Sequence, residues 1–172
     1  SALKILKNKK NLRLIDATNF IIKDLVKFNS SNEAILTQSE DVQKFNIKDF
    51  KVVSKKKPNK SQFKNLIFAF NVCRYVKSNA IVLAAQEATV GIGSGQPSRL
   101  DSCQIAIDKM KKFQNFNELV VAASDAFFPF VDGIEKLVQS GISAVIQPAG
   151  SIRDKEIIKF ANQTNTVLVF SK

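Results

Sequence analysis

From residue 80 onward, short apolar runs alternate with longer segments whose apolar side chains recur at a helical period. This alternation constrains the fold most, because strands separated by helices of about 10 to 15 residues form βαβ units around a largely parallel sheet. We expect strands at 80–85, 89–93, 119–123, 143–148 and 166–170, and helices at 98–113, 133–140 and 151–164. The sequence therefore predicts a three-layer α/β domain with a mixed, largely parallel sheet.

The first fifty residues are expected to form short extended pieces, among them a hairpin around the turn-forming stretch Asn-Ser-Ser-Asn. A further short strand is expected at 50–54. The apolar period then becomes helical, with Asn59 or Ser61 as the candidate N-cap. We therefore divide the chain into a strand-rich segment, residues 1–60, and an α/β part, residues 61–172, which together form one compact unit.

The composition is that of a globular protein, with 45% hydrophobic and 24% charged residues among 172. No apolar run approaches the roughly 18 residues that a membrane-spanning helix needs, and the first ten residues lack the long apolar core of a signal peptide. Cys73 and Cys103 lack the spacing of a metal or redox pair. We expect reduced core thiols in a cytoplasmic protein without a membrane partner.

A net charge of +11 raises nucleic-acid binding as an alternative function. The first sixty residues carry 14 Lys and Arg against 6 Asp and Glu, whereas the glycine-rich and aromatic motifs lie in the remainder, where the charges nearly balance. Tyr and Trp, which often stack on bases, are scarce, with one Tyr and no Trp. A solvated, lysine-rich surface is therefore the preferred interpretation, and nucleic acid is not an expected partner.

Three unusual loops follow predicted strands, at the edge of the sheet where α/β proteins bind ligands. The first loop, 91–99, leads into a helix. Its glycines and the free amides of the helix start suit an anion, and Arg99 adds a positive charge. Tight turns use the same glycine pattern, and the loop lacks both the dinucleotide-binding spacing and the Lys of a phosphate-binding loop. Ligand binding and turn formation both stay open.

The second loop, 124–133, holds three Phe residues around a proline. These rings either plug the core, as we favour for Phe128, or form an aromatic wall. Asp132 next to Gly133 is either a helix cap or a carboxylate that accepts two N–H bonds from a flat heterocycle. An aromatic wall beside a fixed carboxylate would suit such a ligand.

The third loop, 147–154, contains Ser151 and Asp154 in a spacing like that of a capping box. Elsewhere, Asn79 lies at a helix-to-strand junction, where it either ends the helix or presents its amide to a substrate carbonyl. The sequence has no His, which excludes Ser–His and Cys–His nucleophile systems and a histidine base. It also lacks the C-x-x-C and H-x-E motifs of zinc deaminases, so no metal is expected.

The chain resembles, in four stretches that occur in the same order, the C-terminal part of the transformylase domain of bifunctional purine biosynthesis enzymes. These stretches are VKSNAIVLA, TVGIGSGQPSRLDS, ASDAFFPFVDGIE and AVIQPAGSIRD. The resemblance implies a cytidine-deaminase-like α/β fold without zinc and a homodimer with active sites at the subunit interface. It also implies formyl transfer from the co-substrate 10-formyltetrahydrofolate to the 5-amino group of 5-aminoimidazole-4-carboxamide ribonucleotide (AICAR), with an inosine monophosphate (IMP) cyclohydrolase domain in the same protein.

The resemblance assigns roles to residues of these loops. Asn79 is expected near the reacting formyl group, where its amide would donate to the developing oxyanion. AICAR is expected to contact Asn79, Arg99 and Phe127. Asp132 is expected to accept the pterin N–H groups. The folate-binding residues are expected to be Leu100, Pro129, Phe130, Asp132, Gly133 and Ser151.

The sequence departs from the family's pattern at several points. The Lys–His pair, with His as the expected general base, belongs to an earlier part of the family's domain and has no counterpart here, and the histidine-containing tail after the last strand is also missing. Val131 stands where an arginine is usual, and Pro97 where a Met or Gln is usual. We expect a fragment that is inactive without the remaining half of the transformylase domain. The alternative is a non-catalytic module that binds a nucleotide or a folate.

Overall fold

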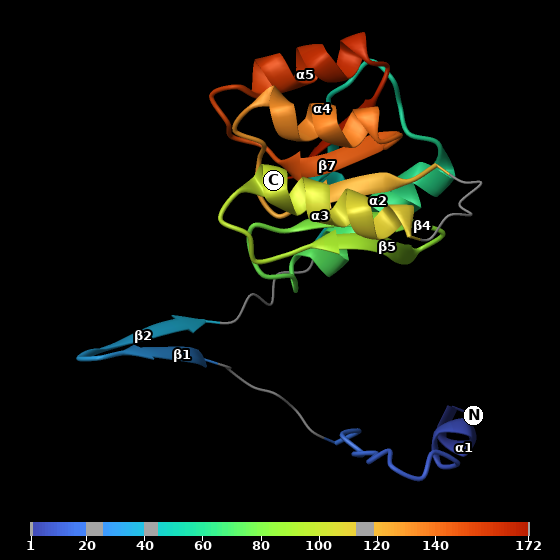
Figure 1. Ribbon diagram of the computed structural model, residues 1–172, viewed down its shortest axis with the longest axis vertical. Helices are drawn as coiled ribbons and strands as arrows, with labels where there is room; N and C mark the ends of the chain where they lie inside the picture. The colour runs from blue at the N-terminus through green and yellow to red at the C-terminus, as the bar shows by residue number, and fades with distance from the viewer. Residues whose placement is uncertain (1, 20–25, 40–44, 113–118, 172) are drawn as a thin grey trace. The chain divides into compact units, whose positions relative to one another are not determined.

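The chain forms two compact units, Ser1–Lys44 and Phe45–Lys172. From the sequence, residues 45–60 are grouped with the N-terminal segment. In the structure they belong to the larger unit, because the short strand at residues 51–52 pairs with the strand at the C-terminal end of the chain. The computed structural model (Figure 1) describes residues 2–19, 26–39, 45–112 and 119–171.

The smaller unit contains helix α1, Ala2–Leu6, and an antiparallel hairpin of β1, Val26–Ser31, and β2, Ala34–Ser39. The expected hairpin is therefore confirmed. Its turn includes Asn32, whose positive φ of 39° is one that Asn tolerates better than most residues. Helix α1 replaces the extended piece that we expected there, because Ala, Leu and Lys all favour helix.

The larger unit is built on a six-stranded sheet with the order β3-β8-β7-β6-β4-β5. The strands are β3 (Lys51–Val52), β4 (Ile81–Ala85), β5 (Ala88–Gly93), β6 (Val121–Ser124), β7 (Ala144–Pro148) and β8 (Val167–Ser171). Strands β5 to β8 run in one direction, and β3 and β4 run in the other. The expected α/β class and mixed sheet are confirmed, although parallel neighbours occur only from β6 through β7 to β8.

The antiparallel pairing of β4 with β5 has a local cause. Only Gln86 and Glu87 join β4 to β5, too few residues for the crossover that parallel neighbours need. Both residues have a positive φ of 53°, as in two-residue hairpin turns. On the other side, Ile81 of β4 is paired with Ser124 of β6, so the beginning of β4 lies beside the end of β6. The loop residues before β4 and after β6 therefore meet.

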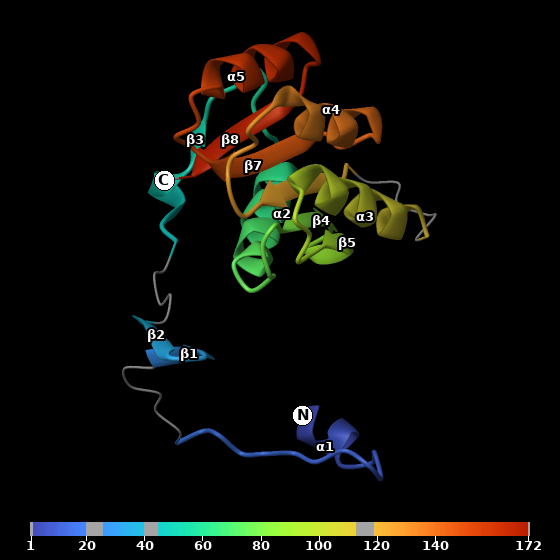
Figure 2. The ribbon, with the colours of Figure 1, turned by 60° about the vertical axis from the view of Figure 1, so that its left-hand side comes forward.

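Helices cover both faces of the sheet (Figures 1 and 2). Helix α2, Lys60–Cys73, packs on one face, and α3, Arg99–Lys111, α4, Val131–Gln139, and α5, Asp154–Gln163, pack on the other. The strands alternate between two apolar cores. In β4, Ile81 and Leu83 belong to the core under α3 to α5, whereas Val82 and Ala84 belong to the core under α2. Burial on both faces explains why these strands are continuous apolar runs.

The starts of the helices confirm one expected cap and correct two others. Asn59 caps α2, because its side chain accepts the Gln62 N–H at 2.8 Å and Gln62 in turn accepts the Asn59 N–H. Helix α5 begins only at Asp154, and the expected capping box with Ser151 is wrong: the Ser151 hydroxyl accepts the Arg153 N–H in a turn that precedes the helix. Asp132 is not a helix cap either, since α4 starts at Val131 and Asp132 lies inside its first turn.

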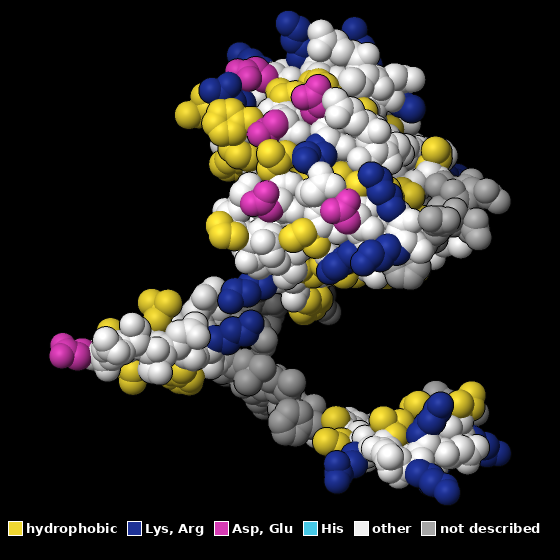
Figure 3. All heavy atoms as spheres, in the orientation of Figure 1, with side chains coloured by type: hydrophobic (Ala, Val, Ile, Leu, Met, Phe, Trp, Pro, Cys, Tyr) yellow, Lys and Arg dark blue, Asp and Glu magenta, His cyan; other side chains and the backbone are white. Residues whose placement is uncertain are grey.

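One face of the larger unit carries charges of both signs. On the face shown in Figure 3, Lys and Arg side chains are interspersed with Asp and Glu rather than gathered in one stripe. Within the described part of the chain, no helix is both long and apolar enough to cross a membrane.

Candidate functional site

A cleft of about 490 Å³ opens at the edge of the sheet where β6 ends. Its walls come from Asn79 shortly before β4, from the start of α3 and the two residues ahead of it, and from the loop that joins β6 to α4 with the first turn of α4. Every site residue expected from the sequence except Ser151 lines this cleft: Asn79, Arg99, Leu100, Phe127, Pro129, Phe130, Asp132 and Gly133. The structure thus brings these residues to one place, and their roles stay predictions.

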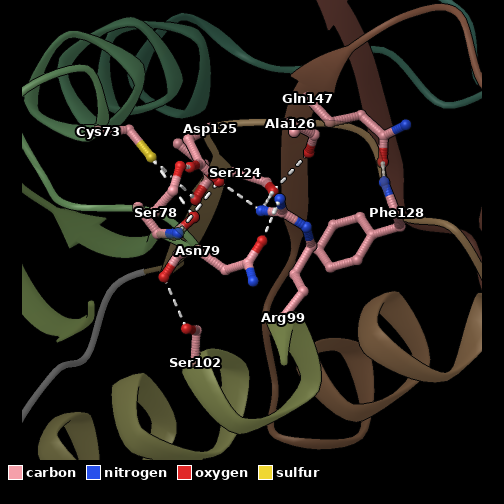
Figure 4. Close-up of polar contacts among 12 residues, drawn as sticks. Cys73, Ser78, Asn79, Arg99, Ser102, Ser124, Asp125, Ala126, Phe128 and Gln147 are labelled. Atoms are coloured by element: carbon pink, nitrogen blue, oxygen red, sulfur yellow. Dashed lines mark hydrogen bonds and ion pairs between the residues drawn. The ribbon is translucent and has the colours of Figure 1, made fainter. Parts of the chain in front are cut away.

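Arg99 is the polar centre of the cleft (Figure 4). Its side chain is only 11% exposed and forms an ion pair with Asp125. Nη1 also donates to the Ser124 hydroxyl at 2.8 Å, and Nη2 donates to Asn79 Oδ1 at 2.8 Å. A guanidinium has five N–H donors. These three bonds fix its plane and leave two donors without a partner among the described residues.

Asp125 is the functional candidate that the sequence analysis missed. Its carboxylate accepts hydrogen bonds from Arg99, from the Ser78 hydroxyl, and from the Ala80 N–H at 3.1 Å. Burial alone raises the pKa of Asp125, but these hydrogen bonds and the charge of Arg99 outweigh it and hold the pKa below its ordinary value. The available signal was its position, because it is a carboxylate directly after the buried strand β6.

The Asn79 amide is fully engaged inside the protein. Its Nδ2 donates to the Gln96 carbonyl at 2.9 Å and to the Pro97 carbonyl at 3.0 Å, while its Oδ1 accepts from Arg99. The donors and acceptors around the amide allow only this orientation. To donate to a substrate oxygen, Asn79 would have to exchange one of its two bonds to carbonyl groups. In the structure, the Asn79 side chain connects the loop before α3 to Arg99 through these hydrogen bonds.

The aromatic loop divides its rings between core and cleft. Phe128 is 1% exposed and belongs to the core, as expected, whereas Phe127 and Phe130 are 39% and 52% exposed and line the cleft. The Phe128 N–H donates to Oε1 of the fully buried Gln147, at the end of β7, at 3.4 Å. The buried Phe128 ring therefore anchors the loop that exposes Phe127 and Phe130 to the cleft.

Asp132 and Ser151 differ in their relation to the cleft. Asp132 lines the cleft, and its Oδ1 accepts the neighbouring Gly133 N–H at 2.7 Å. Within the described residues, its Oδ2 has no hydrogen-bond partner and is free to accept from a ligand. Ser151 does not line the cleft, but it bonds to Arg153, whose guanidinium lies 4.7 Å from the centre of the Phe130 ring.

The glycines of loop 91–99 have packing roles. A Cβ at Gly91 would lie 2.1 Å from the Ala106 carbonyl oxygen, and one at Gly93 would lie 1.9 Å from that of Ser102. Both glycines therefore allow β5 to approach α3 closely. Gly95 has a φ of +67° and makes the turn. Of the two alternatives for this loop, the structure supports turn formation and packing for the glycines, while Arg99 points to the cleft.

These features define the class of protein: an α/β domain with a cleft of small-molecule size between a buried arginine and an aromatic wall. Among the residues that the structure describes, no group of His, Cys, Asp and Glu side chains is placed to hold a metal ion. Residues 1–109 match the family model described as AICARFT/IMPCHase bienzyme. The chain belongs to this family, as its four motif stretches indicated.

Individual relatives give the same assignment. Three proteins named bifunctional purine biosynthesis protein PurH are similar to this chain. The protein from Persephonella marina is 43% identical over 95% of the chain, that from Buchnera aphidicola 43% over 99%, and that from Oenococcus oeni 44% over 99%. The matches cover 32%, 33% and 33% of these relatives, so the chain spans about a third of their length.

Proposed function

We propose that this chain forms part of an enzyme that transfers a formyl group from 10-formyltetrahydrofolate to the 5-amino group of AICAR in the synthesis of IMP. The observation that carries the proposal is the lining of one cleft by residues assigned to the nucleotide, Arg99 and Phe127, and to the folate, Phe130 and Asp132. Membership of the bienzyme family supports the same reaction.

The proposed reaction forms a bond between the AICAR amine nitrogen and the formyl carbon and breaks the bond from that carbon to N10 of the folate. The amine loses a proton, and N10 gains one. The amine is a poor nucleophile because its lone pair is delocalised into the imidazole and the carboxamide. The enzyme must therefore position both substrates, accept the proton and polarise the formyl oxygen.

The described side chains suit the positioning part of this task. The two spare N–H donors of Arg99 would hydrogen-bond the nucleotide, and the exposed ring of Phe127 would pack against it. The free Oδ2 of Asp132, with Phe130 and Pro129 beside it, would receive the pterin N–H groups. The chain has no His. In the proposal, the proton acceptor therefore belongs to the Lys–His half of the family's transformylase domain.

The proposal includes the setting that the resemblance implies. The chain would fold as one of two cytidine-deaminase-like subdomains and act in a cytoplasmic homodimer, with the IMP cyclohydrolase domain in the same protein. Ser151, beside Arg153 and Phe130, would lie at the far edge of the folate site. No metal and no nucleic acid take part in the proposed reaction.

Calorimetric titration of the 172-residue chain with a stable 10-formylfolate analogue, and separately with AICAR, tests the proposal. We expect saturable binding of both. Asp132→Asn should weaken binding of the folate analogue about tenfold or more, because the amide replaces one acceptor with a donor that faces the pterin N–H groups. Glu135→Gln, on the next turn of α4 and outside the cleft lining, is the matched control and should leave both affinities unchanged.

Three results would count against the proposal. Equal folate affinity in wild type and Asp132→Asn would remove Asp132 from the site. Absence of folate binding would mean that this chain does not carry the pocket. Binding of single-stranded nucleic acid that weakens steeply with salt would instead support the charge-based alternative. Formyl transfer after addition of the Lys–His half distinguishes an enzyme part from a non-catalytic binding module.

A further inference from the structure

We propose that Asp125 is a positioning residue of the cleft, which holds Arg99 and the chain before β4 in the arrangement that receives the nucleotide. The inference rests on the proposed function, and it concerns a residue to which the sequence assigned no role. Asp125 is not among the residues that line the cleft. It would therefore act on the nucleotide through Arg99 and not by direct contact.

The position of Asp125 joins three segments that are distant in sequence. Its side chain is 13% exposed, at the end of β6. Oδ1 accepts from Arg99 at the start of α3 and from the Ala80 N–H before β4, and Oδ2 accepts from Ser78. The Asp125 N–H in turn donates to the Ala80 carbonyl at 3.2 Å. Both carboxylate oxygens thus accept hydrogen bonds that connect the start of α3 and the chain before β4 to the end of β6 (Figure 4).

The charge of Asp125 matters because Arg99 is buried. A guanidinium that is only 11% exposed needs a nearby negative charge, since burial of an unpaired charge is strongly unfavourable. Ser124 accepts from Arg99 as well, but it is neutral and donates its own hydrogen to the Ala126 carbonyl at 2.6 Å. Asp132, which lines the cleft, makes no ion pair with Arg99 in the structure. Asp125 therefore supplies the countercharge.

Arg99, held by Asp125, in turn positions the Asn79 side chain. Its Nη2 donates to Asn79 Oδ1, and the Asn79 amide then holds the Gln96 and Pro97 carbonyls. The Asn79 carbonyl also accepts from the Ser102 hydroxyl at 2.7 Å, which ties the same residue to α3. Loss of the Asp125 charge should consequently disturb the nucleotide side of the cleft. The folate side, formed by Phe130 and Asp132, takes no part in these hydrogen bonds in the structure and should be spared.

The test compares Asp125→Asn, Arg99→Ala and the double variant of the 172-residue chain by calorimetry with AICAR and with the 10-formylfolate analogue. Asp125→Asn preserves the size of the side chain and removes its charge. We expect it to weaken AICAR binding about tenfold or more, as is usual when one partner of a buried charge pair is lost. Binding of the folate analogue should change less than about twofold. In the Arg99→Ala background, Asp125→Asn should weaken AICAR binding by less than a further factor of about two, because Asp125 acts on the nucleotide through the Arg99 side chain, which this variant lacks.

Asp108→Asn is the control, since Asp108 is a carboxylate on α3 that bonds only to Gln104 among the described residues. Ser78→Ala is the second variant, which keeps the Asp125 charge and removes one of its hydrogen bonds. It should weaken AICAR binding about two- to fivefold, and it decides the matter if circular dichroism shows that Asp125→Asn does not fold.

The outcomes separate this inference from the proposed function. Normal AICAR affinity in folded Asp125→Asn, or full additivity with Arg99→Ala, overturns the positioning role while the wild-type chain still binds both ligands. Equal loss of both ligands assigns Asp125 a general structural role and overturns it as well. If the wild-type chain binds neither ligand, the proposed function fails, and this inference fails with it.

Discussion

A Cβ atom added to Gly133 would lie 2.6 Å from Cδ1 of the Phe128 ring, closer than real Cβ contacts. Gly133 is buried in the first turn of α4, and Phe128 is the buried anchor of the aromatic loop. The absence of a side chain at residue 133 thus lets the ring lie against the helix backbone. The conformation of the loop that presents Phe127 and Phe130 to the cleft depends on this contact.

We expect Gly133→Ala to lower the free energy of unfolding by about 1–3 kcal/mol, because the added methyl group must displace a ring that is packed on all sides. The displaced loop should also weaken binding of the 10-formylfolate analogue. Urea denaturation and calorimetry measure the two effects. Gln139→Ala, in the last turn of the same helix, is the control. A Gly133→Ala variant with unchanged stability would show that the loop adapts without cost.

Asp125 should make stability depend on pH in the acid range. Since its pKa is lower in the folded chain than the ordinary value of 3.8, its ionised form stabilises the fold at neutral pH. That contribution is lost as the pH falls below about 3.8 and through the folded pKa. We expect Asp125→Asn to be less stable than wild type at pH 7, with a difference that narrows below pH 4. Urea denaturation across this range measures it, and a constant difference would contradict the assignment.

The two thiols should be inert in the folded chain. Cys73 and Cys103 are buried, and burial raises the pKa of each thiol to about 12. Because the thiolate is the reactive form, a thiol reagent at pH 8 should modify neither residue in the native chain and both after denaturation. Counting modified sulfurs by mass spectrometry checks this expectation. Rapid modification of the native chain would mean that one of the two cores opens readily.

The isolated chain should not catalyse formyl transfer above the uncatalysed rate. It contains no His, and the proposed reaction needs a base to accept the proton of a weakly nucleophilic amine. Absorbance of the folate product, followed at several chain concentrations, measures the rate. A rate that rises in proportion to the concentration of this chain would contradict the prediction and assign the base to another residue.

Local patterns in the sequence predicted much of this protein. Continuous apolar runs marked the strands of the sheet from residue 80 onward, because strands buried on both faces carry no polar side. Turn residues marked the hairpin of β1 and β2 and the end of α4 at Gly141, whose φ is +88°. The motifs placed eight of the nine expected site residues, from Asn79 to Gly133, in what proved to be one cleft.

Other features depended on pairing between distant segments. The antiparallel insertion of β4 between β5 and β6 puts Ser78 and Ala80 beside Asp125, and no local pattern records which strands will be neighbours. The start of α5 was misplaced because Ser151 and Asp154 form a turn with the same side-chain chemistry as a helix cap.

The sequence by itself determined the fold class, the family and the residues around the cleft, since these follow from periodicity and from short motifs. Only the tertiary structure decided how their polar groups are used. It pairs Arg99 with Asp125 and commits the Asn79 amide to the Gln96 and Pro97 carbonyls. The physical reason is that a buried charge or amide takes whichever partner the packing brings within hydrogen-bond distance, and packing is a property of the whole domain.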